Sequence, residues 1–151
     1  VIVPDLPPEE AQTLMDLTAD TPLDMIFLAA PTSTAARLAL ISEASRGFIY
    51  YVSRLGTTGV RDQLADDLRM MLEQLRAATS KPVAVGFGVS TPEHVGLVAE
   101  LADGVVVASA ILKLLEDLGD RADRLEHVGE FVAALKTATR IPPAELRLPA
   151  S

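Results

Sequence analysis

Five short runs that are apolar throughout alternate with segments of helical pattern, and this alternation constrains the fold more than any other feature of the sequence. The runs lie at residues 1–3, 25–28, 48–52, 83–85 and 105–107. A strand with one face in solvent alternates apolar and polar residues, whereas a parallel strand covered on both faces is apolar at every position. The sequence therefore predicts an α/β protein whose parallel strands are joined by right-handed βαβ units.

The ends of the last two runs favour one of the two architectures that this pattern leaves open, a doubly wound sheet and a (βα) barrel. Gly86 and Gly88 follow the fourth run, and Ser109 follows the fifth at the start of a short helix. Many barrels bind phosphate after strands seven and eight, where a short extra helix begins. We therefore expect the later part of a TIM (β/α)8 barrel, with five strands present and run 1–3 as strand four.

Five strands cannot close a barrel that needs eight strands and about 250 residues, so the front of the barrel is expected to be missing. The chain opens in strand-like sequence without an initiator methionine, and we expect it to come from a longer protein. With 151 residues, 49% of them hydrophobic, it can bury one sizeable core. We predict a partial barrel domain at residues 1–140 and an irregular tail at residues 141–151.

Charge and composition exclude several classes of function. A formal net charge of -8 argues against binding to nucleic acid or to an anionic membrane surface. No apolar run approaches the roughly 20 residues that span a bilayer, and no secretory signal is visible. The absence of cysteine excludes disulfides and thiolate metal sites and fits a cytoplasmic protein. His94 and His127 lie far apart among charged residues, so we predict no metal site.

Residues 81–93 contain the clearest ligand-binding pattern. The strand Val83–Val85 runs into Gly86 and Gly88, whose missing side chains would let a ligand approach the backbone. Ser90 is a candidate helix cap, with Glu93 three residues on in capping-box register. Free amides beside a helix N-terminus suit an anion such as phosphate. The alternative is a tight βα turn that needs glycine for its own geometry.

Several of these motifs together resemble the tryptophan synthase alpha chain. They are Asp5-Leu6-Pro7 with Glu9-Glu10, the segment from Gly47 to Gly59 with its Tyr-x-x-Ser-Arg-x-Gly-x-Thr-Gly pattern, Gly86-Phe87-Gly88-Val89-Ser90, and Ser109-Ala110-Ile111. The resemblance runs in register from Val1 to about Arg140. It covers only the later part of that family's chain, from about the fourth barrel strand onward.

The resemblance implies a carbon–carbon lyase of tryptophan biosynthesis that cleaves indole-3-glycerol phosphate to indole and glyceraldehyde 3-phosphate. The indole passes to a beta chain that carries pyridoxal phosphate, in an alpha2beta2 complex, and the alpha chain itself has no cofactor. The implied substrate phosphate site comprises Gly59, Gly86, Phe87, Gly88 and Ser109. Tyr50 is implied as an auxiliary catalytic residue near the glycerol portion.

The same resemblance assigns a mobile loop and an interface with the beta chain to Asp5, Arg54, Gly56 and Thr58. It places the main catalytic acid and base, a glutamate and an aspartate, on strands upstream of Val1. Asp5 is the only carboxylate here at an expected strand mouth, since Asp24 and Asp103 precede their strands. We therefore expect the chain to hold the phosphate-binding half of the site and to be inactive alone.

One residue departs from the family pattern, because Ala108 stands where a glycine usually precedes the serine of the last phosphate loop. Its methyl group would either crowd the phosphate or be absorbed by a small backbone shift.

Two other functions stay open. One is a non-catalytic phosphate-binding half-barrel that associates with itself through open sheet edges. The other is a different phosphate-binding barrel enzyme, which fits the two glycine and serine loops but not residues 54–59.

Overall fold

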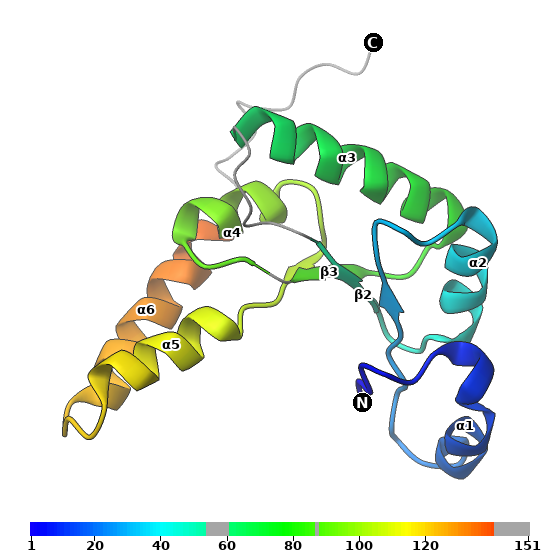
Figure 1. Cartoon of the computed structure of the whole chain (residues 1–151), viewed down its shortest axis with the longest axis horizontal. Coiled ribbons are helices and arrows are strands. Elements are labelled where there is room, and N and C mark those ends of the chain that lie inside the picture. Colours follow the sequence, from blue (N-terminus) through cyan, green and yellow to red (C-terminus); the bar gives the residue numbers. More distant parts are fainter. Residues whose placement is uncertain (54–60, 87, 141–151) are drawn as a thin grey trace.

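The computed structural model describes residues 1–53, 61–86 and 88–140, which form a parallel sheet with helices packed against it (Figure 1). The four strands are β1 (Leu28–Ala29), β2 (Ile49–Val52), β3 (Val83–Gly86) and β4 (Gly104–Val105). The helices are the 3-10 turn η1 (Pro8–Glu10), α1 (Gln12–Thr18), α2 (Ala35–Ala44), α3 (Arg61–Ala78), α4 (Pro92–Ala99), α5 (Ser109–Leu118) and α6 (Arg124–Ala138). The α/β class is thereby confirmed.

The order of the strands distinguishes a barrel wall from a doubly wound sheet. The strands pair in chain order, β1-β2-β3-β4, and every pair is parallel. A doubly wound sheet needs a point where the strand order reverses, which sends later helices to the opposite face. Right-handed crossovers in unbroken order instead keep every helix on one face, as in the wall of a TIM barrel.

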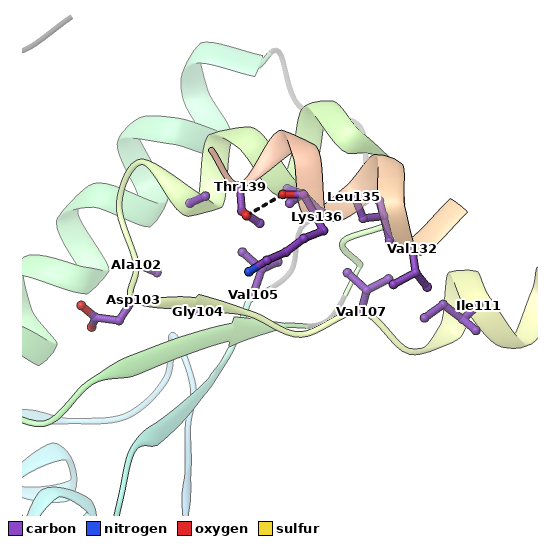
Figure 2. A pocket seen from close by; sticks show the side chains of 12 residues that line it. Ala102, Asp103, Gly104, Val105, Val107, Ile111, Val132, Leu135, Lys136 and Thr139 are labelled. Carbon is purple, nitrogen blue, oxygen red and sulfur yellow. Dashed lines mark hydrogen bonds between the residues drawn. The ribbon is translucent and has the colours of Figure 1, made fainter. Parts of the chain in front are cut away.

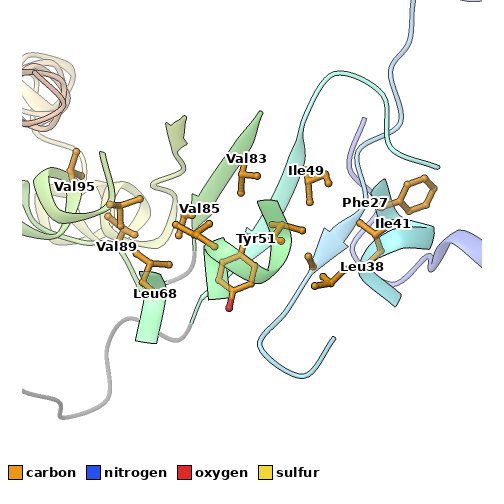
Figure 3. Packing of buried hydrophobic residues seen from close by; sticks show 14 of the residues in the cluster. Phe27, Leu38, Ile41, Ile49, Tyr51, Leu68, Val83, Val85, Val89 and Val95 are labelled. Atoms are coloured by element: carbon orange, nitrogen blue, oxygen red, sulfur yellow. The ribbon is translucent and has the colours of Figure 1, made fainter. Parts of the chain in front are cut away.

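The core lies between that helical layer and one face of the sheet (Figure 3). Ile49, Tyr51, Val83 and Val85 are 0–3% exposed and face it. They pack in one cluster with buried residues of the helices, namely Leu38, Ile41, Leu68, Leu72, Leu75, Val95, Val98 and Leu135. Burial raises the pKa of the Tyr51 hydroxyl to about 12. Its strand neighbour Tyr50 points to the opposite face and is half-buried, because side chains alternate along a strand.

The outermost strands of the sheet are shorter than the sequence predicts. Run 1–3 forms a single parallel bridge, Ile2 to Ile26, and not a full fifth strand. Pro4 ends this run because it has no N–H to donate, and Val1 and Ile2 are 50% and 39% exposed. The central strands β2 and β3 occupy their predicted places, since each has a strand partner on both sides.

Side-chain caps begin two of the helices. Thr34 caps α2 by accepting a hydrogen bond from the amide of Arg37 at 3.3 Å. The cap of α4 is Thr91 and not Ser90: the hydroxyl of Thr91 accepts from the amide of His94 at 3.3 Å, and the helix begins at Pro92. The predicted cap was therefore one residue too early, because serine and threonine are both good caps and stand side by side here.

Two negative findings apply to the described ranges only. None of the helices found there is both long and apolar enough to span a membrane. Within the same ranges, no group of three or more histidine, cysteine, aspartate or glutamate side chains is placed to hold a metal ion.

Candidate functional site

The carboxyl ends of β2, β3 and β4 meet at one edge of the sheet, because the strands are parallel and paired in register. Tyr50 on β2, Gly86 and Gly88 at the end of β3, and Ser109 at the start of α5 belong to this edge. Of the other site residues predicted from the sequence, Asp5 is described, and five lie outside the described residues, namely Arg54, Gly56, Thr58, Gly59 and Phe87.

Gly86 is in close contact with Tyr50. A β-carbon built on Gly86 would lie 2.6 Å from Cε2 and 2.9 Å from Cζ of the Tyr50 ring, and would also overlap its hydroxyl oxygen. Real β-carbons do not approach other atoms so closely. Glycine at this position therefore admits the tyrosine ring across the backbone of β3. The sequence predicted a close approach at Gly86, and here the approaching group is Tyr50.

Ser53, the residue after β2, binds the same glycine from another direction. Its amide donates to the carbonyl oxygen of Gly86 at 2.9 Å, and its hydroxyl donates to the same oxygen at 3.0 Å. Ser53 is only 5% exposed. No role for Ser53 was predicted from the sequence, although the Tyr-x-x-Ser spacing places a hydroxyl at the end of the strand that carries Tyr50.

Gly88 turns the chain from β3 toward α4. Its φ of 80° lies in the left-handed region, which glycine adopts without strain. Val89 follows and is 2% exposed, so the turn is anchored in the core. The structure thus supplies a conformational reason for Gly88, as the tight-turn alternative requires. The turn lies at the carboxyl edge of the sheet.

Ser109 begins α5 at the same edge and is exposed. Ala108 precedes it with φ -129° and ψ -64°, outside the left-handed region, so a β-carbon is compatible with this backbone. The Ala108 carbonyl accepts hydrogen bonds from the amides of Ile111 and Leu112, both at 3.0 Å. The N-terminus of this ten-residue helix carries a partial positive charge that favours anions.

Carboxylates lie at both the carboxyl and the amino ends of the strands. Asp5 follows run 1–3 at the carboxyl edge and is exposed. Asp103 lies at the amino ends of the strands, where it accepts hydrogen bonds from the Val83 amide at 2.8 Å and from Arg76 at 2.7 Å. Burial raises the pKa of Asp103, but these two hydrogen bonds and the charge of Arg76 outweigh it, and the pKa is lowered overall. Asp103 therefore joins α3, β3 and β4 on the side away from the candidate site.

A groove of about 680 Å³ lies beside β4, away from the Tyr50–Gly86 contact (Figure 2). Its walls come from β4 and from the helices α4, α5 and α6, and are mostly apolar. The lining residues are Val95, Ala99, Ala102, Asp103, Gly104, Val105, Val107, Ile111, Val132, Leu135, Lys136 and Thr139. The groove marks a sheet edge that has no strand beside it among the described residues.

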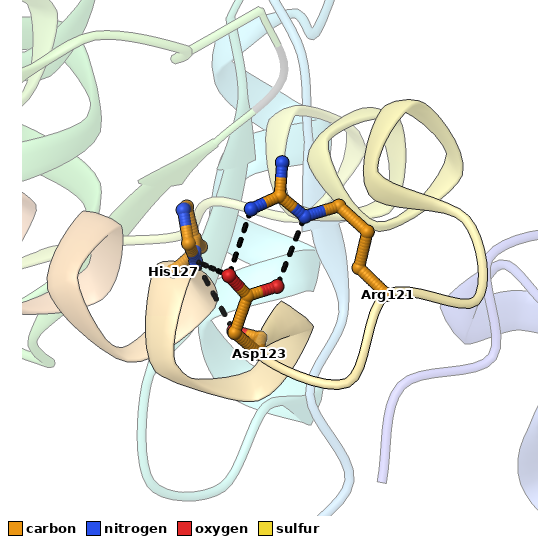
Figure 4. Close-up of polar contacts among 3 residues, drawn as sticks. All are labelled: Arg121, Asp123 and His127. Carbon is orange, nitrogen blue, oxygen red and sulfur yellow. Dashed lines mark hydrogen bonds and ion pairs between the residues drawn. The ribbon is translucent and has the colours of Figure 1, made fainter.

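The turn between α5 and α6 carries a polar cluster of its own (Figure 4). Arg121 donates two hydrogen bonds to the carboxylate of Asp123, at 2.9 and 2.7 Å, and lowers the pKa of Asp123 to about 2. His127 Nδ1 lies 3.8 Å from the same carboxylate. All three side chains are at least 40% exposed, so the cluster shapes a surface turn.

These features define the class of the protein as a (βα)-barrel segment with a candidate anion site at the carboxyl ends of its strands. Comparison with known proteins identifies the family. The sequence model of the tryptophan synthase alpha chain family matches residues 1–142. The chain belongs to the tryptophan synthase alpha chain family.

Individual relatives agree with this assignment. The tryptophan synthase alpha chain of Geobacter sp. (strain M21) is 50% identical over 136 residues, which are 90% of this chain and 51% of the relative. The alpha chain of Arabidopsis thaliana is 44% identical over 139 residues, 91% of this chain and 50% of the relative. The chain therefore spans about half the length of the curated relatives that it matches.

Solved structures give the same result for the fold. The tryptophan synthase alpha subunit of Legionella pneumophila superposes with a TM-score of 0.78 at 32% identity, covering 91% of this chain and 50% of that one. A Mycobacterium tuberculosis tryptophan synthase chain superposes with a TM-score of 0.77 at 38% identity, covering 93% and 51%. The four-stranded sheet with its helices thus corresponds to half of a longer structure.

Proposed function

We propose that this chain forms the phosphate- and glycerol-binding half of an indole-3-glycerol phosphate lyase of tryptophan biosynthesis. The observation that carries the proposal is the meeting of Tyr50, the Gly86–Gly88 turn and Ser109 at the carboxyl edge of a family-matched sheet. Amides of the turn and of the α5 N-terminus offer hydrogen bonds to the phosphate. Tyr50 lies against Gly86 at the start of this turn, where its ring can position the glycerol portion. Gly59 and Phe87 complete the proposed phosphate site.

The reaction also needs a catalytic acid and a catalytic base. Cleavage of the carbon–carbon bond requires a proton delivered to the indole ring and another removed from a glycerol hydroxyl. Among the described residues, Asp5 is the only carboxylate that follows a strand at the carboxyl edge. We assign the acid and the base to strands in the half of the relatives that this chain does not span. This chain alone is then a binding half without lyase activity.

The proposal extends to a partner and a location. Asp5 lies on the rim of the carboxyl edge and, with Arg54, Gly56 and Thr58, is proposed to face a tryptophan synthase beta chain. The beta chain would hold pyridoxal phosphate and receive the indole, so the alpha chain needs no cofactor of its own. A cytoplasmic location agrees with the acidic sequence that has no cysteine.

A titration with sn-glycerol 3-phosphate, a stand-in for the phosphate end of the substrate, tests the proposal. We expect saturable binding by the 151-residue chain, with chemical-shift changes at Gly88 and Ser109 in NMR spectra, and no cleavage of indole-3-glycerol phosphate. Free glycerol, which has no phosphate, is the matched control ligand. Equal binding of both ligands, or no shift at either residue, would contradict a phosphate site here.

The groove beside β4 supports a second candidate function, self-association of two half-barrels. Val1 and Ile2 are exposed on one outer edge of the sheet, and Val132 is 43% exposed in the groove at the other. Unpaired edges invite strand pairing, so run 1–3 of a second copy is the proposed occupant. Lys136 in the groove has no acidic partner in the described part of the chain. The carbonyl of Asp24 accepts a hydrogen bond from the Val1 amino group, so Asp24 lies near the start of run 1–3 and offers the complementary charge.

Light scattering of the chain tests this second candidate directly. A dimer that becomes a monomer when Lys136 is changed to Glu, but not when the exposed Lys113 of α5 is changed to Glu, would support it. A chain that is monomeric at every concentration tested would exclude it.

A further inference from the structure

Ser53 makes two hydrogen bonds to a single acceptor, and only one of them belongs to the sheet. The parallel register pairs Val52 with Gly86, so the amide of Ser53 donates to the Gly86 carbonyl as the last hydrogen bond between β2 and β3. Almost any residue at position 53 would make that bond. The hydroxyl bond at 3.0 Å to the same oxygen is additional, and it needs serine or threonine.

The two bonds fix the direction of the Gly86 carbonyl. A carbonyl oxygen has two lone pairs, and both are directed at Ser53. The bonds are buried, since Ser53 is 5% exposed, so water competes little for the oxygen. On its α-carbon, Gly86 is also covered by the Tyr50 ring. Gly86 is therefore held from two sides at the point where β3 ends and the turn to Gly88 begins.

A carbonyl oxygen carries a partial negative charge, and its direction matters beside a site for an anion. If the Gly86 oxygen turned toward the ligand, it would repel a phosphate oxygen and tilt the turn that follows. Because both of its hydrogen bonds come from β2, the oxygen points along the sheet toward β2 and away from β4 and Ser109.

We propose that Ser53 is a positioning residue for phosphate binding, which acts by holding the Gly86 carbonyl toward β2. The inference rests on the proposed function, since it concerns the same site. It adds a residue that acts on the site through its two hydrogen bonds to Gly86. It also connects the strand that carries Tyr50 to the turn after β3, so the glycerol and phosphate sides of the site share one support.

Ser45 provides a matched control within the chain. It is 1% exposed, and its hydroxyl accepts a hydrogen bond from the Phe27 amide at 3.2 Å. Like Ser53 it is a buried serine whose hydroxyl bonds to the backbone of a neighbouring segment. Phe27 precedes β1, however, so this bond lies at the amino side of the sheet and not at the candidate site.

The test compares three variants of the full 151-residue chain in titrations with sn-glycerol 3-phosphate. Loss of one buried hydrogen bond predicts a roughly fivefold to tenfold weaker affinity for Ser53→Ala. Ser53→Thr keeps a hydroxyl, and its affinity should stay within about twofold of the unaltered chain. Ser45→Ala should lose stability without a change in affinity. The carbonyl ¹³C resonance of Gly86 should shift in Ser53→Ala only.

Other results would overturn the inference. Affinity of Ser53→Ala equal to that of the unaltered chain would do so, as would an equal loss in Ser45→Ala, which would mean that the effect is general destabilisation. If Ser53→Thr is as weak as Ser53→Ala, the hydroxyl is not the cause. Failure of the unaltered chain to bind the ligand would overturn the proposed function together with this inference, and so differs from failure of Ser53 alone.

Discussion

The two sides of the candidate site differ in how completely the chain packs them. On the β2–β3 side, Ile49, Val83 and Val85 are fully buried, and Gly86 is held by Tyr50 and Ser53. On the β4 side, neither β4 nor α5 contains a buried residue, and a groove opens along the outer edge of the strand. A βα unit is thus well packed where it has neighbours on both sides, and among the described residues the last unit has a strand neighbour on one side only.

This difference bears on the two parts of the proposed phosphate site. The turn after β3 is fixed by contacts within the chain, whereas Ser109 begins a helix whose apolar residues are only partly covered. The β3 turn should therefore keep its geometry in the chain alone. The helix that carries Ser109 depends more on whatever packs against the β4 edge.

The largest effect is expected from truncating a leucine on the packed side. Leu75 of α3 is 0% exposed, so Leu75→Ala should lower the free energy of unfolding by about 2–5 kcal/mol. Leu112 of α5 is 66% exposed, and Leu112→Ala should change it by less than about 0.5 kcal/mol. Urea unfolding followed by circular dichroism measures both variants. Similar losses would mean that α5 is packed as well as α3, and that the two sides of the site do not differ in packing.

A smaller effect is expected at the contact between Gly86 and Tyr50. The methyl group of Gly86→Ala would meet the tyrosine ring at 2.6–2.9 Å, so the ring must move, at a cost of about 1–3 kcal/mol. In a Tyr50→Ala background the space is free, and the same substitution should cost much less. A double-mutant cycle on unfolding free energies measures this coupling. Additive effects would show that the ring is not the obstacle.

Much of the fold could be predicted from the sequence because the strands of a parallel sheet are apolar at every position. Run 48–52 and run 83–85 became β2 and β3. Run 1–3 could not be predicted as a bridge, since its residues favour strand. Pairing at a sheet edge depends on partners that a local sequence pattern does not specify.

The site was predictable in part, and for a different reason. Glycine and serine mark the ends of β3 and the start of α5 because these residue types suit turns and helix starts. The Tyr50–Gly86 contact and the role of Ser53 were not predictable from residue types, because both depend on the register between β2 and β3. Ser53 also follows a strand of four residues, where a lone serine is an ordinary strand end.

At the amino edge of the sheet, Asp103 should make stability depend on pH. Its pKa is lowered in the folded chain, so its contribution is complete above the unfolded value of about 3.9 and is lost as the pH falls through the folded value. Asp103→Asn should therefore cost about 1 kcal/mol at pH 7 and progressively less as the pH falls through the folded pKa. Urea unfolding at several pH values measures the difference. A cost that does not change with pH would argue against the charged hydrogen bonds to Val83 and Arg76.

The smallest effect on stability is expected in the turn between α5 and α6, where the ion pair is exposed and solvent screens it. Hydrogen bonding by Arg121 lowers the pKa of Asp123 to about 2, so Arg121→Ala should return that pKa toward 3.9 while the unfolding midpoint stays unchanged. A carboxyl ¹³C NMR titration measures the pKa directly. The control is Arg124→Ala, because Arg124 pairs with Asp120 at 3.4 Å and should leave Asp123 as it is. If the pKa of Asp123 stayed near 2 without Arg121, another group would be its main partner. A large loss of stability would instead mean that the turn is packed as tightly as the β2–β3 side.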